Sequence, residues 1–506
     1  MEKHTVILYN PKQYVMGENQ FKAMPYSLLA LSAVLEPDKY VVVIIDGFFT
    51  PNPENELKKY KNILAIGVTT ITGEVIIDAL QFSKSARKIC PGVPIIWGGS
   101  HPSVCPHDTI NDPHIDYVVK GQGEVPFKRL LECLIEGKSA ENIPGLTLKK
   151  NGEMIDNPIE TPKNVNDFPP FPYHLLDVGQ YVDSYPVIGK RTLVYITSQG
   201  CPFGCKFCSD VVLYKNKWSG LSPERMFNDI SIFKERYNVD SVMFYDNNFF
   251  VDMRRVVGLC NLLIDNNINI KWCGDIRVDQ FNRIKDEEME AMVKAGCISF
   301  LVGAESGNEK VLEIVRKRIK PKDIIDMAIR AKKYKFKVVY SFMTGFPEIY
   351  EEELKDTMSL IMKLRDIDKE SRIIFCMYAP YPGADLTKTY EHLFTFPNSL
   401  DGWATFTLTK NTSITSWIGS DHTKLLHSVS NFYLPLAFSN LNLWNEIRVL
   451  GETNQVVNVL HKILQNIAIF RLRKGYYSFL FEEPIINMVL SIRRKLKKYI
   501  RRPGKT

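Results

Sequence analysis

The stretch that decides the fold is Cys201-Pro202-Phe203-Gly204-Cys205-Lys206-Phe207-Cys208, which follows the apolar run 192–197. The spacing of Cys201, Cys205 and Cys208 suits thiolates that wrap around one iron–sulfur cluster, and Gly204 lets the backbone fold tightly between them. Four thiolates would saturate a [4Fe-4S] cluster, whereas three leave one iron open to a ligand from outside the protein. The loop therefore predicts a catalytic cluster.

A zinc knuckle and a set of buried free cysteines are the alternatives to a cluster. A zinc site would need a fourth Cys or His at motif spacing. The next cysteine is Cys260 and the next histidine is His392, both far beyond that spacing. The cluster is therefore the favoured interpretation.

A CxxxCxxC loop at the end of a first barrel strand resembles the radical S-adenosylmethionine (SAM) family. The resemblance implies that Cys201, Cys205 and Cys208 hold a [4Fe-4S] cluster and that SAM binds its open iron. It further implies that the reduced cluster cleaves SAM to a 5′-deoxyadenosyl radical, with an external electron donor such as flavodoxin or ferredoxin. Phe207, within the loop, is assigned to cofactor binding on the same resemblance.

Residues 189–395 alternate strand and helix patterns, which predicts a partial (β/α)6 barrel with its sites at the carboxyl ends of the strands. One strand ends in Gly303-Ala304-Glu305-Ser306-Gly307, which closely resembles the Gly-x-Glu-Ser-Gly strand end of the family. The resemblance implies that Glu305 and Ser306 face the ribose and methionine of SAM. A helix-capping role for Glu305 is the alternative.

Two further strand ends carry polar side chains. Asp246, Asn247 and Asn248 stand where the family contacts the amino group of SAM, and carboxylate and amide oxygens suit an ammonium group. Arg277, after the next strand, resembles the polar segment of the family and is assigned to the carboxylate of a ligand. A structural ion pair within the protein is the alternative for Arg277.

Residues 1–140 alternate five short apolar runs with helical patterns, which predicts a Rossmann-like, doubly wound parallel sheet of the α/β class. Such sheets bind ligands at the carboxyl ends of their strands. The order of strands and glycines is similar to the cobalamin-binding domain found in front of many radical SAM enzymes. The residues that this resemblance assigns to cobalamin are Asn10, Asp46, Thr69, Gly98, Gly99, His101, Gly121, Gly123 and Glu124.

The segment Asp46-Gly47-Phe48-Phe49 stands where some cobalamin domains carry Asp-x-His-x-x-Gly, and it has no histidine. We therefore expect cobalamin to be bound without a lower-face histidine from this loop. His101 is a weaker candidate ligand, and a hydrogen-bonding loop residue is its alternative. For the whole domain, the alternative is a structural Rossmann-like module without a cofactor.

Residues 141–188 are predicted to form a linker. Asn151-Gly152 between apolar runs indicates a hairpin, and the proline-rich stretch 167–173 suits a stiff connection. Residues 396–506 are expected to form a helical C-terminal domain with a basic tail that closes over the barrel mouth.

The net charge of +7 over 506 residues has a local origin, because eight Lys and Arg and no acid lie in 492–506. The nearly neutral remainder argues against nucleic-acid binding. Apolar residues at helical spacing over 485–500, flanked by cations, predict peripheral membrane contact and a lipid-like substrate. The alternative is a stripe that packs on the barrel, followed by a solvated basic end.

The chain begins with a strand pattern rather than a signal peptide, and seven of its ten cysteines are scattered. Both features predict a cytoplasmic protein. The favoured function is a cobalamin-dependent methyltransferase that acts on an unactivated carbon or a phosphinate of a small-molecule or lipid-like substrate. The alternatives are an oxidative cyclase or ring-rearranging enzyme of the same architecture, such as the anaerobic magnesium-protoporphyrin ester cyclase, and a non-catalytic iron–sulfur carrier or cobalamin sensor.

Overall fold

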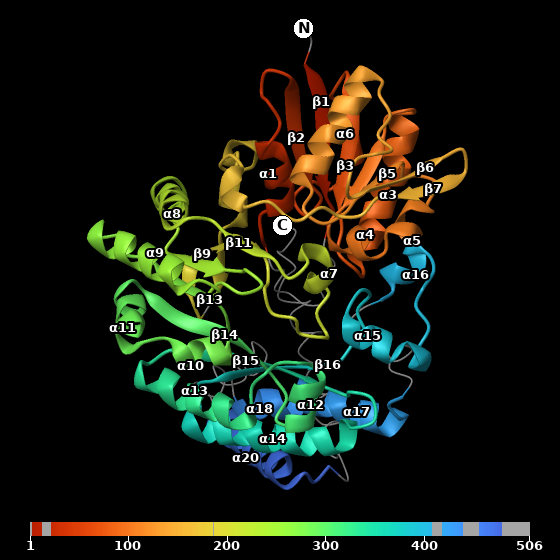
Figure 1. Cartoon of the computed structure of the whole chain (residues 1–506). Coiled ribbons are helices and arrows are strands. Elements are labelled where there is room, and N and C mark those ends of the chain that lie inside the picture. Colours follow the sequence, from red (N-terminus) through yellow and green to blue (C-terminus); the bar gives the residue numbers. More distant parts are fainter. Residues whose placement is uncertain (1–2, 13–21, 186, 407–416, 439–454, 478–506) are drawn as a thin grey trace, which may run out of the picture.

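The computed structural model describes residues 3–12, 22–185, 187–406, 417–438 and 455–477. Two sheet-containing units lie one above the other in Figure 1, the first in red to orange and the second in green to cyan. Each is built on a seven-stranded sheet. The predicted architecture of a Rossmann-like unit followed by a partial barrel is confirmed.

The first sheet has the order β2-β1-β3-β4-β5-β6-β7, and its first five strands are parallel. These strands are β1 (His4–Asn10), β2 (Tyr40–Asp46), β3 (Ile63–Thr69), β4 (Ile95–Gly98) and β5 (Tyr117–Val119). Alternate residues of β1 face opposite layers: Val6 and Leu8 pack with α1 (Tyr26–Ala33) and α6 (Glu124–Glu136), whereas Ile7 and Tyr9 pack with α3 (Val75–Ile89). The sheet is therefore covered by helices on both faces.

The antiparallel hairpin of β6 (Leu146–Lys150) and β7 (Glu153–Asp156) extends this sheet beyond β5. Asn151 and Gly152 at its tip have φ of 53° and 85°, as the predicted Asn-Gly turn requires. The first sheet thus runs past residue 140, where the sequence placed the domain boundary. The short strand β8 (Asp183–Tyr185) likewise joins the second sheet, so the connection between the sheets is 157–182.

The second sheet has the order β16-β15-β14-β13-β12-β9-β8, with six parallel strands followed by antiparallel β8. The parallel strands are β9 (Gly189–Tyr195), β12 (Ser241–Phe244), β13 (Lys271–Arg277), β14 (Cys297–Glu305), β15 (Lys337–Thr344) and β16 (Arg372–Met377). Helices α8 (Pro223–Tyr237), α9 (Met253–Asp265), α11 (Asp286–Lys294), α13 (Pro321–Lys333) and α14 (Tyr350–Ile367) cover the outer face (Figure 1).

Side-chain alternation along β15 shows which face of the barrel is open. Val338, Tyr340 and Phe342 are buried in the core that this sheet shares with its helices, whereas Ser341 and Met343 between and after them are only half-buried. The inner face of the half-barrel is therefore the face left for ligands.

The described parts of the C-terminal region contact both units, and Trp417 Nε1 donates to Gly345 O, just beyond the carboxyl end of β15, at 2.9 Å. Closure of this region over the barrel mouth stays a prediction, because 407–416, 439–454 and 478–506 lie outside the described residues. Trp403, in α16 (Leu400–Ala404), lies in the core of the first unit, and its Nε1 donates to Asp108 Oδ2 at 2.7 Å. Helices α18 (Leu434–Phe438) and α20 (Gln455–Lys474) pack beside β16 and α14. The predicted basic tail, including 485–500, lies outside the described residues.

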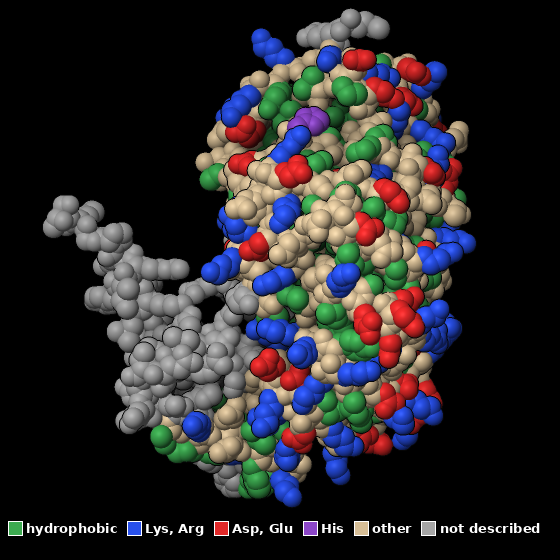
Figure 2. All heavy atoms as spheres, turned by 90° about the vertical axis from the view of Figure 1, so that its left-hand side faces the viewer, with side chains coloured by type: hydrophobic (Ala, Val, Ile, Leu, Met, Phe, Trp, Pro, Cys, Tyr) green, Lys and Arg blue, Asp and Glu red, His purple; other side chains and the backbone are tan. Residues whose placement is uncertain are grey.

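Two surface properties bear on partners. On the face shown in Figure 2, basic and acidic side chains are interspersed over the described surface, without the continuous basic area typical of nucleic-acid binding. Among the helices in the described part of the chain, none combines the length and apolar character of a membrane span.

Candidate functional site

The cysteine loop starts just beyond the carboxyl end of β9. The short strand β10 (Ser198–Gly200) leads into it and pairs with β11 (Trp218–Gly220). Gly200 has φ of +78°, and a Cβ at this position would lie 2.2 Å from Lys217 O. Only glycine therefore fits where the chain turns from β10 into the loop.

Three distant segments hold the cysteine loop in place. Lys206 N donates to Val315 O at 3.0 Å, and Lys206 O accepts from Leu386 N at 2.7 Å. Arg277, at the end of β13, donates from Nη1 to Cys205 Sγ at 3.2 Å. The segments after β14 and β16 and the end of β13 thus fix the loop across the barrel mouth.

The donor set of this loop fits an iron–sulfur cluster better than a single metal ion. Among the described residues, no three His, Cys, Asp or Glu side chains converge on one ion position. Cys201, Cys205 and Cys208 are free thiols, and a cluster needs each thiolate to bind a different iron. Burial raises the pKa of the Cys208 thiol to about 12, so cluster assembly must release its proton.

Asp246, predicted to contact SAM, has its carboxylate committed to the fold. It accepts from Thr197 N and Thr197 Oγ1, both at 2.8 Å, and from Ser198 Oγ at 2.6 Å. Its exposed fraction is 1%, and burial raises its pKa. The carboxylate thus joins the end of β12 to the chain beyond β9, and the structure does not offer it to a ligand.

Asn248 and Ser306 are also engaged inside the protein. Asn248 Nδ2 donates to Gln280 Oε1 at 2.6 Å, and Ser306 Oγ lies 3.1 Å from Thr357 Oγ1 of α14. Asn247, in contrast, is exposed, lines a cavity at the barrel mouth and donates to Asp210. Of the polar group after β12, Asn247 is therefore the residue that faces open space.

Glu305 ends β14 in the left-handed region, with φ of 64°. Its Oε1 lies 2.5 Å from Lys317 Nζ, and the two side chains are 7% and 6% exposed. A Cβ at residue 303 would lie 2.3 Å from Glu305 Oε1, so glycine there makes room for the carboxylate. Lys317 escaped the sequence analysis because it sits between two arginines, in what reads as a surface charge run.

Arg277 pairs with a carboxylate of the protein. Its Nε donates to Asp279 Oδ1 at 2.9 Å, and its Nη2 donates to Lys317 O at 2.6 Å. The guanidinium carbon lies 4.1 Å from the centre of the Phe203 ring. The structure therefore shows the ion pair that was the alternative interpretation, and it adds contacts to the cysteine loop. Phe207, at the other end of that loop, packs against the core that contains Val315.

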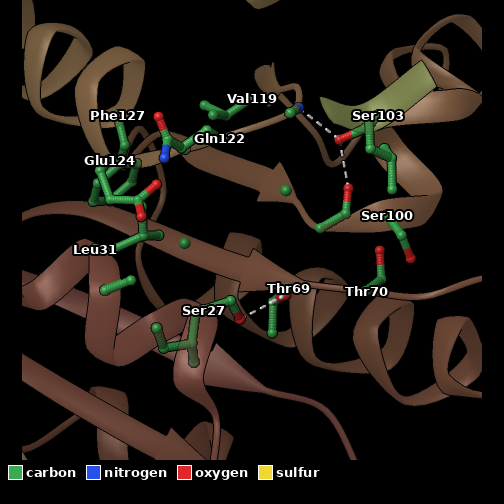
Figure 3. A pocket seen from close by; sticks show the side chains of 18 of the residues that line it. Ser27, Leu31, Thr69, Thr70, Ser100, Ser103, Val119, Gln122, Glu124 and Phe127 are labelled. Atoms are coloured by element: carbon green, nitrogen blue, oxygen red, sulfur yellow. Dashed lines mark hydrogen bonds between the residues drawn. The ribbon is translucent and has the colours of Figure 1, made fainter. Parts of the chain in front are cut away.

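A cavity of about 280 Å³ lies at the carboxyl ends of β3, β4 and β5, beside α1 and α6 (Figure 3). Of the residues predicted to bind cobalamin, the cavity is lined by Thr69, Gly98, Gly99, Gly121, Gly123 and Glu124. Hydroxyl groups of Ser27, Thr69, Thr70, Ser100 and Ser103 line one side, and Leu31, Val119 and Phe127 contribute apolar surface (Figure 3).

Two observations indicate that this cavity is shaped for a ligand such as the tail of cobalamin. A Cβ at residue 99, where φ is +100°, would lie 2.4 Å from Thr70 O, so the backbone approaches too closely for any residue but glycine. Thr70 Oγ1 is buried without a partner in the described structure. An apolar wall beside a row of hydroxyls, one of them without a partner, fits an aromatic base attached to a ribose phosphate.

Asn10 and Asp46 line a different cavity. Asn10 Nδ2 and Tyr181 Oη both donate to Asp46 Oδ2, at 3.0 and 2.8 Å, so the carboxylate links β1, β2 and the connection between the units. Burial raises the pKa of Asp46. The cavity that these residues line has about 390 Å³ and reaches the barrel residues Ile196 and Tyr245.

His101 lines none of these cavities. Its Nδ1 lies 3.1 Å from Thr72 Oγ1, and its ring centre lies 5.4 Å from that of Trp403 in the core. Burial lowers its pKa to about 4. The structure therefore places His101 in the interior of the first unit in a hydrogen-bonding role, which is the interpretation that the sequence favours over ligation of cobalt.

The cavities are neighbours that lie between the two units. A third cavity, of about 230 Å³, is lined by 196–200 and Asn247 of the barrel. It shares Ser27, Glu124 and Tyr214 with the strand-end cavity of the first unit, and Tyr26 and Tyr245 with the 390 Å³ cavity. The strand ends of the first sheet and residues 196–200, which lead into the cysteine loop, therefore line neighbouring cavities, and we call these three cavities together the interdomain cleft.

Gln199, two residues before Cys201, connects the two units across this cleft. Its Nε2 donates to Glu124 Oε1 at 2.9 Å, and its Oε1 accepts from Gln122 Nε2 at 2.8 Å. Burial raises the pKa of Glu124. Sequence reasoning missed Gln199 because a glutamine on a short strand carries no motif of its own.

Two family models match this chain. The model for the radical SAM superfamily matches residues 195–361, and the model for the B12 binding domain matches residues 13–131. The two matches fall on the second and first sheets, and they lie on opposite sides of the interdomain cleft.

Several known proteins are similar to this chain over most of its length. An uncharacterised methyltransferase of Pyrococcus horikoshii is 32% identical over 71% of this chain and 76% of its own. An anaerobic magnesium-protoporphyrin IX monomethyl ester cyclase of Synechocystis is 23% identical over 71% of this chain and 72% of its own. The solved structure of the cobalamin-dependent SAM radical enzyme OxsB with aqua-cobalamin has a TM-score of 0.68 at 18% identity, and it covers 93% of this chain and 72% of that one.

Proposed function

Because the chain belongs to the radical SAM superfamily and carries its B12-binding domain, we propose that it is a cobalamin-dependent methyltransferase. The observation that carries the proposal is the interdomain cleft, which is lined by the strand ends of the first sheet and by residues 196–200 immediately before the cysteine loop. Two cofactors held on opposite sides of this cleft would be placed to act on one bound substrate.

The cysteine loop and the first sheet have separate roles in this proposal. Cys201, Cys205 and Cys208 would hold a [4Fe-4S] cluster, and the strand ends at Thr69, Gly99 and beyond would hold cobalamin. When bound, the cluster and SAM would supply a 5′-deoxyadenosyl radical, and cobalamin would supply a methyl group. The protein itself orients these groups and keeps water away from them.

For SAM, the side chains that remain available are Asn247 and Glu305. Asn247 faces the cleft, and Glu305 uses Oε1 for Lys317, which leaves Oε2 as an acceptor for a ligand hydroxyl. Asp246 and Ser306 support the site from behind through their bonds to Ser198 and Thr357. We therefore assign direct contact to the first pair and a supporting role to the second.

The lining of the cleft favours a carbon atom over a phosphinate as methyl acceptor. Two of its basic side chains, Lys22 and Arg225, are already engaged. Lys22 lies 3.1 Å from Asp183, and Arg225 donates to backbone carbonyls, including Phe168 O at 2.9 Å. Phe49, Tyr181 and other aromatic side chains surround much of the remaining space. An uncharged small molecule or lipid-like chain suits this lining better than an anion.

An oxidative cyclase or ring-rearranging enzyme is the second candidate. It is favoured by the similarity to the magnesium-protoporphyrin ester cyclase of Synechocystis, which matches 71% of this chain. The two candidates share the cluster, the cleft and the need for an external one-electron donor such as flavodoxin or ferredoxin. They differ in the fate of the methyl group of SAM, which a methyltransferase transfers and a cyclase does not.

The distinguishing experiment uses the full chain, reconstituted anaerobically with iron and sulfide and supplied with SAM, cobalamin and a chemical reductant. A methyltransferase yields 5′-deoxyadenosine together with S-adenosylhomocysteine, and omission of cobalamin removes the second product. Deoxyadenosine alone, with and without cobalamin, would support the cyclase instead. A chain that yields neither product would contradict both.

We also propose a cytoplasmic location with peripheral membrane contact. All ten cysteines are free thiols, which supports a reducing compartment.

The basic tail 492–506 and the apolar stripe over 485–500 support contact with an anionic surface. Vesicles with and without anionic lipid test this: the full chain should sediment with anionic vesicles at low salt, and a chain truncated after Pro484 should not. Equal sedimentation of both chains would remove the tail as the anchor.

A further inference from the structure

Arg277 is the basic side chain through which β13 reaches the sulfur of a predicted cluster ligand. The contact joins Arg277 Nη1 to Cys205 Sγ at 3.2 Å. The inference drawn from it rests on the proposed function, because it concerns the cluster that Cys205 would help to hold.

The position of Arg277 is determined on every side. Asp279 and the carbonyl of Lys317 accept from the other two guanidinium nitrogens, at 2.9 and 2.6 Å, and Phe203 of the cysteine loop stacks on the guanidinium plane at 4.1 Å. The side chain is 8% exposed. A buried guanidinium held by four groups cannot turn away from Cys205 without breaking several contacts.

The chemistry of such a contact concerns electron transfer. Arginine stays protonated at any working pH, and a charge acts more strongly in a buried site than in water. Reduction adds one negative charge to an iron–sulfur cluster, and hydrogen bonds to the sulfurs, net charge and burial set its potential. A cation that donates to a ligand sulfur therefore stabilises the reduced form more than the oxidised form.

We propose that Arg277 is a positioning residue that holds Cys205 and raises the reduction potential of the cluster. The step concerned is a one-electron reduction: one electron passes from an external donor to the cluster, whose net charge becomes more negative by one. Asp279, on the far side of the guanidinium, carries the opposite charge and partly offsets this effect. The two residues therefore set the potential in opposite directions.

The test is an EPR-monitored redox titration of the anaerobically reconstituted full chain, with dithionite as reductant, without SAM, after iron and sulfide are counted. Arg277→Met should shift the midpoint potential to a more negative value at unchanged iron content. Arg277→Lys keeps the positive charge but lacks the planar guanidinium group, so it should shift the midpoint potential less. Asp279→Asn should shift the potential to a less negative value.

Arg225→Met is the matched control. Arg225 also donates to backbone carbonyls and stacks on an aromatic ring, that of Phe171 at 5.4 Å, but its described contacts do not include the cysteine loop. Its substitution should leave the potential unchanged. A wild-type potential in Arg277→Met, or an equal shift in Arg225→Met, would overturn the inference.

Two further outcomes separate this inference from the proposed function. If Arg277→Met assembles no cluster, the midpoint potentials of Asp279→Asn and Arg277→Lys test the inference instead. A shift of the potential in the same direction in both variants would overturn it. If the wild-type chain assembles no cluster, the proposed function fails first. If the wild-type cluster assembles and substitutions of Arg277 and Asp279 leave its midpoint potential unchanged, the inference is wrong and the proposed function still stands.

Discussion

Lys317 is the residue at which the contacts behind the cysteine loop converge. Its Nζ lies 2.5 Å from Glu305 Oε1, and its carbonyl accepts from Arg277 at 2.6 Å. One lysine thus connects the end of β14 to the end of β13. Because both members of the ion pair are buried, the loss of either leaves a charge without compensation.

Replacing Lys317 by Met should therefore destabilise the protein strongly. We expect the free energy of unfolding to fall by about 3–5 kcal/mol, because Glu305 would stay buried without its partner. Urea unfolding of the cluster-free chain measures the loss. The double variant Glu305→Gln/Lys317→Met should recover most of it. A loss within the error of the measurement in the single variant would show that the pair does not matter for stability.

The three loop cysteines give a second residue-scale prediction. Cys201→Ala, Cys205→Ala and Cys208→Ala should each abolish cluster assembly, because each thiolate would bind a different iron. Iron counts and the visible absorbance of the reconstituted chain report the loss. Cys133→Ala, on α6 and away from the loop, is the control and should assemble a full cluster. A full cluster in any loop variant would contradict the assignment.

At the scale of elements, the turn from β15 into α14 is built around a buried carboxyl. Gly345 N and Thr344 Oγ1 donate to Glu353 Oε2 at 3.0 and 3.3 Å, whereas Glu353 Oε1 is buried without a partner. Burial raises the pKa of Glu353 to about 8. The folded chain therefore holds a proton there that the unfolded chain releases at a lower pH.

This raised pKa predicts how stability depends on pH. The ordinary pKa of a glutamate is 4.5, so below this pH the Glu353 carboxyl is protonated in both the folded and the unfolded chain. Between pH 4.5 and about 8 it is protonated only in the folded chain. The free energy of unfolding should thus fall with rising pH in this window, by on the order of 1 kcal/mol per unit. Glu353→Gln should flatten that slope in urea unfolding between pH 5 and 8. An identical slope in both proteins would contradict the assignment.

The elements themselves were largely predictable, and the uses of their polar residues were not. Short apolar runs that end in glycine or small polar residues gave the strands of both sheets, because burial on both faces requires such runs. A carboxylate at a strand end has the same sequence signature whether it binds a ligand or ties two strands together. Asp246 turned out to join Thr197 and Ser198, and Lys317 could not be paired with Glu305 from sequence because only the fold brings them together.

At the scale of the whole molecule, contacts between residues that are distant in the sequence hold the first unit against the barrel. Trp403 inserts from beyond the barrel into the core of the first unit, and Tyr26 Oη of α1 donates to Val194 O of β9 at 2.8 Å. Neither contact has a sequence signature, because each depends on the packing of residues more than 150 positions apart.

Gln199 also holds the two units together, through hydrogen bonds to Gln122 and Glu124 of the first unit. Gln199→Leu should weaken cobalamin binding about tenfold, because Glu124 and Gln122, which line the strand-end cavity, would both lose a partner. Absorbance titration with aqua-cobalamin gives the dissociation constant. Gln180→Leu, at an exposed position of the connection between the sheets, is the control and should bind as the wild type does. Unchanged affinity in Gln199→Leu would show that the contact does not shape the site.

The measurement that tests the central claim most directly is the EPR spectrum of the full chain that holds both cob(II)alamin and the reduced cluster. The strand ends of the first sheet and the segment that leads into the cysteine loop line neighbouring cavities, so the two unpaired spins should lie close enough to interact. We predict a spectrum that is broadened or split relative to the sum of the spectra of the two singly loaded proteins. A doubly loaded protein whose spectrum equals that sum would contradict a shared cleft.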